Sequence, residues 1–116
     1  MKAELRRWRN SDTGEAGELV WFWCAACDTH HAINPKGWKW NGDTERPTFS
    51  PSVLVRGSVL TAEGLAMVDR REVPPDGQYP SRDTVCHSFV RDGQIQYLGD
   101  CTHKLAGQTV PLEDLP

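Results

Sequence analysis

Short runs of alternating apolar and polar residues, separated by glycine, proline and other turn formers, predict a mostly β chain. Strands are expected over residues 3–9, over the aromatic-rich residues 18–23 and over residues 52–59. Residues 11–17 contain the Asp, Thr and Gly that hairpin loops favour. No stretch repeats its apolar residues at helical spacing. We therefore predict a small single domain, residues 1–116, of short antiparallel strands and hairpins.

Two longer segments lack a clear strand pattern. Residues 34–51 are irregular and rich in Asn, Gly and Pro, and loops of this kind tend to carry function. Residues 61–84 contain several prolines and an Asp-Gly pair. We expect a surface excursion over residues 61–84, with a short strand over residues 65–68.

The clearest local pattern is a hairpin in the last third of the chain. Two apolar-rich runs, residues 85–91 and 94–98, are separated only by Asp92 and Gly93. An Asp-Gly pair suits the two positive-φ positions of a type I′ turn. A two-residue turn fixes the register of the hairpin, because the residues that flank the turn must face each other.

This register assigns the polar and sulfur-bearing residues of the hairpin to two faces. Cross-strand partners share a face, and alternate residues do so as well. Cys86, Cys101 and, if the second strand continues, His103 are expected on one face. His87 and Asp100 are expected as diagonal neighbours on the other face.

Composition narrows the possible environments and partners of the chain. The 116 residues are 38% hydrophobic and 25% charged, with a net charge of -3, which is ordinary for a globular protein and gives no basic excess for nucleic acid. No apolar run reaches membrane-spanning length, and residues 1–10 carry charges where a signal peptide would be apolar. We expect a cytoplasmic protein with neither membrane nor nucleic acid as its partner.

The four cysteines predict a zinc site. Cys24 and Cys27 form a C-x-x-C at the end of an expected strand, the usual position of a zinc-ribbon knuckle, and Cys86 and Cys101 flank the hairpin. In a reducing compartment this pattern favours a metal over disulfides, with two disulfides as the alternative. Three thiolates and the imidazole of His103 form a second possible ligand set. The fold we expect is thus arranged around a zinc-ribbon-like centre.

Several residues are candidates for nucleophilic catalysis. Ser52 follows Pro51 at a rigid transition from loop to strand, which favours it over Ser50 and Ser88 as a nucleophile. A carboxylate on one ring nitrogen of a histidine leaves the other nitrogen free to accept a proton. The expected pair of His87 and Asp100 fits this arrangement, with a solvated polar pair as the alternative. His103 is a second candidate for the general base.

Several motifs together resemble a known family. They are Cys24-x-x-Cys27, Trp40-Asn41-Gly42, Pro47-Thr48-Phe49-Ser50-Pro51-Ser52, Cys86-His87-Ser88-Phe89 and Asp100-Cys101-Thr102-His103 with the residues that follow. The chain resembles a small family of phage and prophage proteins, some labelled ammonia monooxygenase, although an oxygenase site would need more His or carboxylate ligands. The family includes the BubE-type peptidases of bacterial operons for ubiquitin-like conjugation. The resemblance implies a serine-type peptidase that processes or removes a ubiquitin-like protein.

Two hypotheses of function follow. The first is a zinc-stabilised hydrolase that acts on a ubiquitin-like or other protein substrate, with Ser52 as nucleophile, His103 or His87 as general base and Asp100 as the orienting group. A variant makes the metal catalytic, but a closed shell of four thiolates would leave no position for a water. The second is a non-catalytic phage or prophage zinc-ribbon-like module whose exposed aromatic residues bind a protein. A short distance between Ser52 and a histidine would favour the hydrolase.

Overall fold

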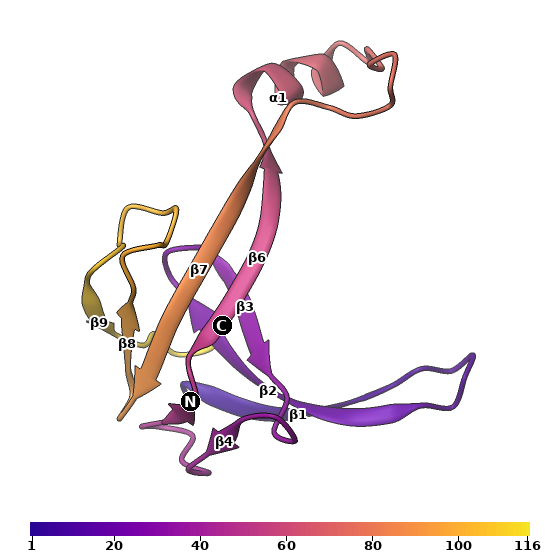
Figure 1. The fold of residues 1–116 in the computed structure, drawn as a ribbon. Helices are drawn as coiled ribbons and strands as arrows, with labels where there is room; N and C mark the ends of the chain where they lie inside the picture. The colour runs from indigo at the N-terminus through magenta and orange to yellow at the C-terminus, as the bar shows by residue number, and fades with distance from the viewer.

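The computed structural model describes residues 1–116 as a single domain of antiparallel strands with one short helix (Figure 1). The elements fall into three sheets, with strand orders β1-β2-β3, β4-β5 and β6-β7-β8-β9. Their bounds are β1 Ala3–Arg9, β2 Ala16–Cys24, β3 Thr29–Ile33, β4 Lys39–Trp40, β5 Phe49–Ser50, β6 Val53–Leu60, α1 Ala62–Asp69, β7 Ser81–Arg91, β8 Gln94–Tyr97 and β9 Thr109–Pro111. The predicted mostly β class is confirmed.

The first sheet carries the cysteine knuckle. β1 and β2 form a long hairpin around the expected loop, and β2 ends at Cys24. A turn in which Asp28 has a φ of 53° then returns the chain as β3, which pairs with β2 in the register Phe22 with His31. β3 was not predicted from sequence, because its five residues follow a turn that lacks the Gly or Pro that usually marks the start of a new strand.

The third sheet contains the predicted hairpin. β7 and β8 pair in the register Arg91 with Gln94, as the two-residue turn requires, and Asp92 and Gly93 have φ values of 51° and 76°. β7 is 11 residues long, and it also pairs along β6 over eight residues. The four residues from Ser81 to Thr84, expected in the surface excursion, therefore belong to β7.

The remainder of the excursion contains a helix in place of the predicted strand over residues 65–68. α1 begins after Thr61, whose hydroxyl accepts a hydrogen bond from the N–H of Gly64 at 3.2 Å, and this N-cap stabilises the first turn. Gly64 packs so closely against the carbonyl of Pro80 that a Cβ would not fit. The strand prediction was wrong because a capped helix of eight residues shows too few turns for its period to be recognised.

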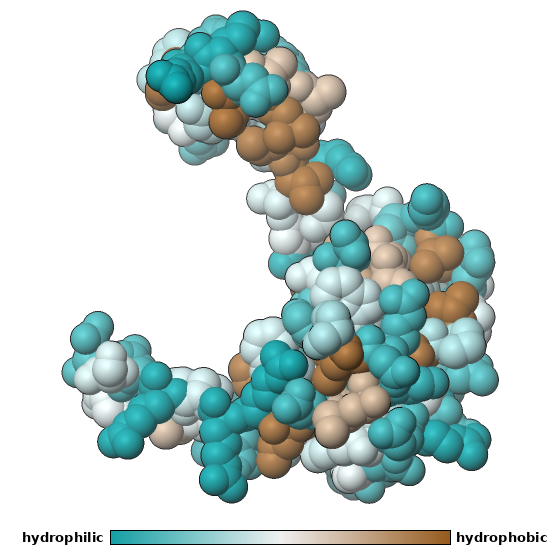
Figure 2. Space-filling model, turned by 180° about the vertical axis from the view of Figure 1, so that it is seen from behind, coloured by the Kyte–Doolittle hydropathy of each residue, from teal (hydrophilic) through white to brown (hydrophobic).

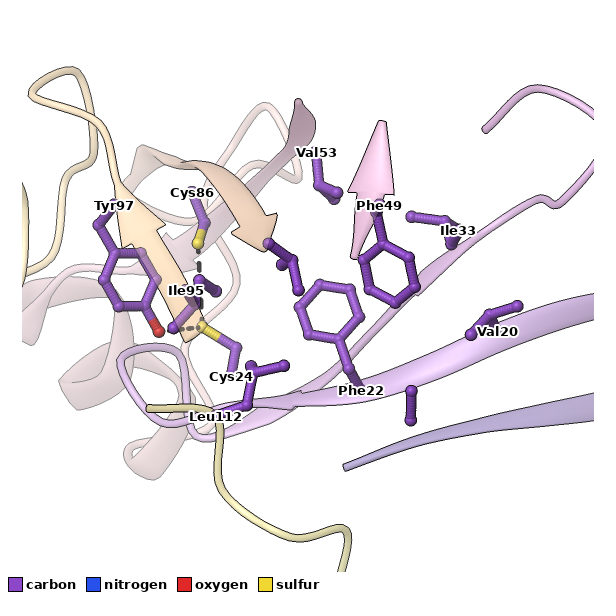
Figure 3. Close-up of a cluster of buried hydrophobic side chains, with 12 residues drawn as sticks. Val20, Phe22, Cys24, Ile33, Phe49, Val53, Cys86, Ile95, Tyr97 and Leu112 are labelled. Atoms are coloured by element: carbon purple, nitrogen blue, oxygen red, sulfur yellow. Dashed lines mark hydrogen bonds between the residues drawn. The ribbon is translucent and has the colours of Figure 1, made fainter. Parts of the chain in front are cut away.

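The core lies between the first and third sheets (Figure 3). Val20, Phe22 and Cys24 of β2 point inward, and their side chains are fully buried. They pack with side chains of the other elements, among them Ile33, Phe49, Val53, Cys86, Val90, Ile95, Tyr97 and Leu112. Two cysteines of the expected metal site are thus part of the core itself.

Two projections give the molecule a crescent outline (Figure 2). One is the β1–β2 hairpin, and the other is the outer part of the β6–β7 ladder with α1 at its tip (Figure 1). The helical tip exposes Leu65 and Val68, which are 56% and 45% accessible. None of the helices has the length and apolar character needed to cross a membrane.

Candidate active site and metal centre

Ser52, His87 and Asp100 form a continuous chain of hydrogen-bonding groups. The Oγ of Ser52 lies 3.0 Å from Nε2 of His87, and Nδ1 of His87 lies 3.0 Å from Oδ2 of Asp100. An ionised carboxylate can only accept, so Nδ1 carries the proton and Nε2 is left to accept from the serine hydroxyl. This order of hydroxyl, imidazole and carboxylate is that of a nucleophile, its base and an orienting group.

Strand register brings the three residues together. His87 of β7 pairs with Leu54 of β6, so their side chains share a face. Ser52 lies two residues before Leu54 and reaches the same face of the sheet, as its contact with His87 shows. After β8, the N–H of Leu98 donates to the carbonyl of His87 at 2.8 Å. This hydrogen bond keeps the chain beside β7, so that Asp100, two residues later, reaches the imidazole of His87. The diagonal relation of His87 and Asp100 follows the register predicted from sequence.

The site is open to solvent on one side and held by the core on the other. The side chains of His87 and Asp100 are 25% and 58% accessible, and Ser52 is partly buried. The indole Nε1 of Trp38 donates to the backbone carbonyl of Ser52 at 3.1 Å. The imidazole and carboxylate are therefore partly open to solvent, while an aromatic residue packed against the core holds the serine backbone.

A second cluster gathers sulfur and nitrogen donors on the opposite face of β7. The donor atoms of Cys24, Cys27, His31 and Cys86 all lie within 4.8 Å of one another. This number and type of donor fit a tetrahedral metal ion such as zinc. No disulfide joins any of the four cysteines of the chain, so the alternative of two disulfides is not seen.

His31 strengthens the case for a bound metal. The residue is 6% accessible, and its Nε2 is buried without a hydrogen-bond partner. A buried polar atom without a partner costs free energy unless something satisfies it. His31 was not among the ligands predicted from sequence, and the signal that would have found it is the β2–β3 pairing, which sets His31 diagonal to Cys24.

Cys101 and His103 are placed differently from the knuckle ligands. Cys101 is absent from the first donor group and belongs with His103 to a second group that shares Cys86. The Sγ of Cys101 lies 3.2 Å from both the N–H and the carbonyl of His87. The Nδ1 of His103 accepts from the N–H of Leu105, on the metal side of the sheet and away from the Ser52 hydroxyl. Of the two histidines considered as a base, His87 is the one beside Ser52.

The thiols of the first donor group differ in acidity. The contact with Cys86 is the main cause that lowers the pKa of Cys24, and the Tyr97 hydroxyl acts in the same direction, against the effect of burial. The Tyr97 hydroxyl lies 3.2 Å from the sulfur, and its pKa is raised by burial and by this hydrogen bond. Burial raises the pKa of Cys27 to about 11. The neighbouring Cys86 sulfur and the Tyr97 hydroxyl therefore favour the thiolate form of Cys24, which is the form that binds a cation.

Two hollows lie along the β6–β7 ladder. One, of about 340 Å³, is bordered by Cys27, His31, Cys86 and His103 on the metal side. The other is a wider and shallower depression of about 480 Å³, and Arg56, Ser58, Asp83 and Val85 contribute to its wall. These four residues share the face of Leu54 and His87, although Ser52, His87 and Asp100 do not themselves line the second hollow.

The protein is thus a small antiparallel β domain. Hydrogen-bonded Ser52, His87 and Asp100 lie on one face of β7, and a cluster of cysteine and histidine donors that could hold a metal ion lies on the other. The chain belongs to the BubE family, described as the bacterial ubiquitination-like system serine protease, and the family matches residues 3–98. Ser52 and His87 lie within the matched residues, and Asp100 lies two residues beyond them. Comparison with curated proteins and with solved structures gave no match.

Proposed function

We propose that this protein is a serine peptidase that processes or deconjugates a ubiquitin-like protein and is stabilised by zinc. The observation that carries the proposal is the 3.0 Å approach of His87 Nε2 to Ser52 Oγ, with Asp100 at 3.0 Å behind the imidazole. The alternative of a non-catalytic binding module gives no reason for a hydroxyl, an imidazole and a carboxylate to line up. Membership of a family described as serine proteases supports the same choice.

The first half of the proposed reaction is acyl transfer. Ser52 Oγ attacks the carbonyl carbon of a peptide or isopeptide bond while its proton passes to His87 Nε2. Asp100 stabilises the imidazolium that results and keeps the ring in the required orientation. His87 then gives the proton to the departing amine as the C–N bond breaks. The acyl group remains on Ser52 as an ester.

The second half returns the enzyme to its starting state. A water molecule attacks the ester carbonyl while His87 Nε2 takes a proton from it. The proton is then given to Ser52 Oγ as the ester C–O bond breaks, and a free carboxylate leaves. The partial exposure of His87 and Asp100 gives water the access that this step needs.

The metal in this proposal is structural. Cys24, Cys27 and Cys86 would provide three thiolates and His31 the fourth donor, whereas Cys101, the fourth ligand expected from sequence, lies with His103 in a second group that shares Cys86. Four protein donors leave no position for an activated water. Cross-strand pairing supports the same role, because Cys86 and its partner Val55 face away from the side that His87 shares with Leu54.

The deciding experiment locates the reactive serine. A fluorophosphonate probe should modify Ser52, detected by peptide mass mapping, and Ser52→Ala should remove both labelling and turnover without lowering the unfolding temperature. Ser50→Ala and Ser88→Ala are matched controls, since the first changes an exposed residue and the second a buried hydroxyl without a partner. Labelling of Ser50 or Ser88, or full activity of Ser52→Ala, would overturn the assignment.

The substrate class requires a separate measurement. We expect the enzyme to release a short extension fused to the C-terminus of a ubiquitin-like protein from a bacterial ubiquitination-like system. If Ser52 reacts with the probe but the extension stays attached, the protein is a serine hydrolase with another substrate. If both reactions fail in the zinc-loaded protein, the catalytic hypothesis is wrong.

A further inference from the structure

The strand that follows Ser52 lies at a free edge of its sheet. The order β6-β7-β8-β9 leaves β6 with a single neighbour, β7. Half of the backbone N–H and C=O groups of such a strand point away from its partner. An edge strand is a template on which another extended chain can pair.

The register identifies which groups point outward. Leu98 donates to the carbonyl of His87, so the backbone of His87 faces the β8 side of β7. Leu54, the partner of His87 in β6, then belongs to a pair without mutual hydrogen bonds. By the alternation of antiparallel strands, the N–H and C=O groups of Leu54, Arg56 and Ser58 point to the open edge.

The surroundings of this edge suit a second chain. Leu54 is 44% accessible, although it is a large apolar residue paired directly with His87. Gly57 lacks a side chain in the middle of the strand and borders both hollows, and a glycine inside a strand often marks a close approach of another backbone. Apart from β7, α1 is the element that packs against β6, and it does so only at the far end of the strand.

We propose that the substrate binds as an extra antiparallel or parallel strand on the open edge of β6, paired to the backbone of Leu54, Arg56 and Ser58. The inference rests on the proposed function: a chain bound to β6 is identified as the substrate because Ser52, the proposed nucleophile, directly precedes this strand. Ser52 precedes the first residue of β6 by one position, so a chain paired along β6 runs toward the serine. The substrate is therefore an extended, unfolded segment of polypeptide, such as a tail or linker.

A backbone scan of a peptide probe tests the pairing. A tetra-alanyl diphenyl phosphonate and its singly N-methylated derivatives are compared by their rates of reaction with Ser52. If the peptide forms a strand, only alternate amides donate to β6, so methylation should slow the reaction at every second position by about tenfold. Equal effects at all positions, or no effect at any, would overturn the proposal.

A variant of the enzyme tests the same contact from the other side. Arg56→Pro removes an N–H that points to the open edge and leaves the β6–β7 hydrogen bonds in place. Arg56→Ala is the matched comparison, because it removes the same side chain but keeps the N–H. The proline variant should react with the peptidyl phosphonate about tenfold more slowly than the alanine variant. Both variants should react equally with a small fluorophosphonate.

The two probes separate this inference from the proposed function. A reactive Ser52 with equal peptidyl rates in both Arg56 variants would contradict strand pairing and leave the peptidase assignment standing. If neither probe labels Ser52 in the unmodified protein, the proposed function fails and the substrate inference fails with it. Slower reaction of Arg56→Pro with both probes would show that the substitution disturbs the site itself, which counts against the pairing.

Discussion

Two tryptophans make the same kind of hydrogen bond at different distances from the chemistry. Trp38 Nε1 donates to the carbonyl of Ser52 at 3.1 Å, and Trp40 Nε1 donates to the carbonyl of Asp43 at 3.3 Å. Both rings also pack against the core. Only the first bond restrains the backbone of the proposed nucleophile, so Trp38 is a candidate positioning residue.

Trp38→Phe should slow the reaction of Ser52 with a fluorophosphonate more than it lowers stability. Loss of the hydrogen bond costs about 1 kcal/mol, which corresponds to about fivefold in rate if the bond orients the serine. Trp40→Phe removes an equivalent bond away from the site and should leave the labelling rate unchanged. Labelling rates and urea unfolding of both variants measure the two effects. Equal labelling rates would show that Trp38 has a structural role only.

At the level of single residues, the sequence allowed part of the site to be predicted. The Asp92-Gly93 turn sets the register, and the register sets the relation of His87 to Asp100 that the structure contains. His31 was missed as a donor because its position beside Cys24 depends on a strand that no turn residue announced. The structure places His31, and not the predicted Cys101, in the donor group with Cys24, Cys27 and Cys86. This difference depends on distances between elements, which the alternation of residues along a strand does not provide.

Among the elements, the turn between β7 and β8 does more than join two strands. Gly93 donates to the carbonyl of Pro47 at 3.0 Å and accepts from the N–H of Leu112 at 2.9 Å. A Cβ on Gly93 would lie 3.1 Å from Cα of Arg46. The turn thus connects the β7–β8 hairpin to the loop before β5 and to the segment after β9.

Gly93→Ala should destabilise the protein more than another glycine with the same backbone conformation. Left-handed φ in a residue with a side chain costs about 1–2 kcal/mol, and crowding against Arg46 adds to it, so we expect a loss of about 2–4 kcal/mol in the free energy of unfolding. Gly14→Ala is the control, because Gly14 has a φ of 75° and open space around it, with an expected loss of about 1 kcal/mol. Urea unfolding measures both, and equal losses would contradict a role for close packing.

The elements that sequence predicted well are those whose pattern is long or whose turn is explicit. β1 and the inner part of β2 alternate over several residues, and β7 and β8 flank the clearest turn in the chain. The helix α1 was missed because it is short and because its contact with Pro80 depends on the absence of a side chain at Gly64. The close packing of Gly64 against Pro80 depends on both segments together, so neither segment shows it as a periodic pattern in the sequence.

In the molecule as a whole, one strand connects the metal cluster to the proposed catalytic relay. Cys86 and His87 are neighbours on β7 and point to opposite faces. Asp100 and Cys101 repeat this arrangement after β8, with Asp100 on His87 and the sulfur of Cys101 on the His87 backbone. His87 and Asp100 are therefore each adjacent in sequence to a cysteine whose side chain lies on the metal side of the sheet. An ion held by Cys86 would restrain His87 directly, and Asp100 through its hydrogen bond to His87.

Removal of the metal should consequently lower both stability and the reactivity of Ser52. We expect chelation to lower the unfolding temperature by at least about 10 °C. Below the lowered unfolding temperature, fluorophosphonate labelling of the folded protein should still slow, because His87 and Asp100 lose their restraint. The variant Cys27→Ser tests the same link without a chelator.

Cys27 is exposed and distant in sequence from His87 and Asp100, so its substitution should affect them only through the metal. The variant should bind zinc more weakly, and its labelling should be slower to a degree that added zinc reverses. A labelling rate that is independent of zinc while the protein stays folded would separate the metal from the relay and leave it a role in stability alone.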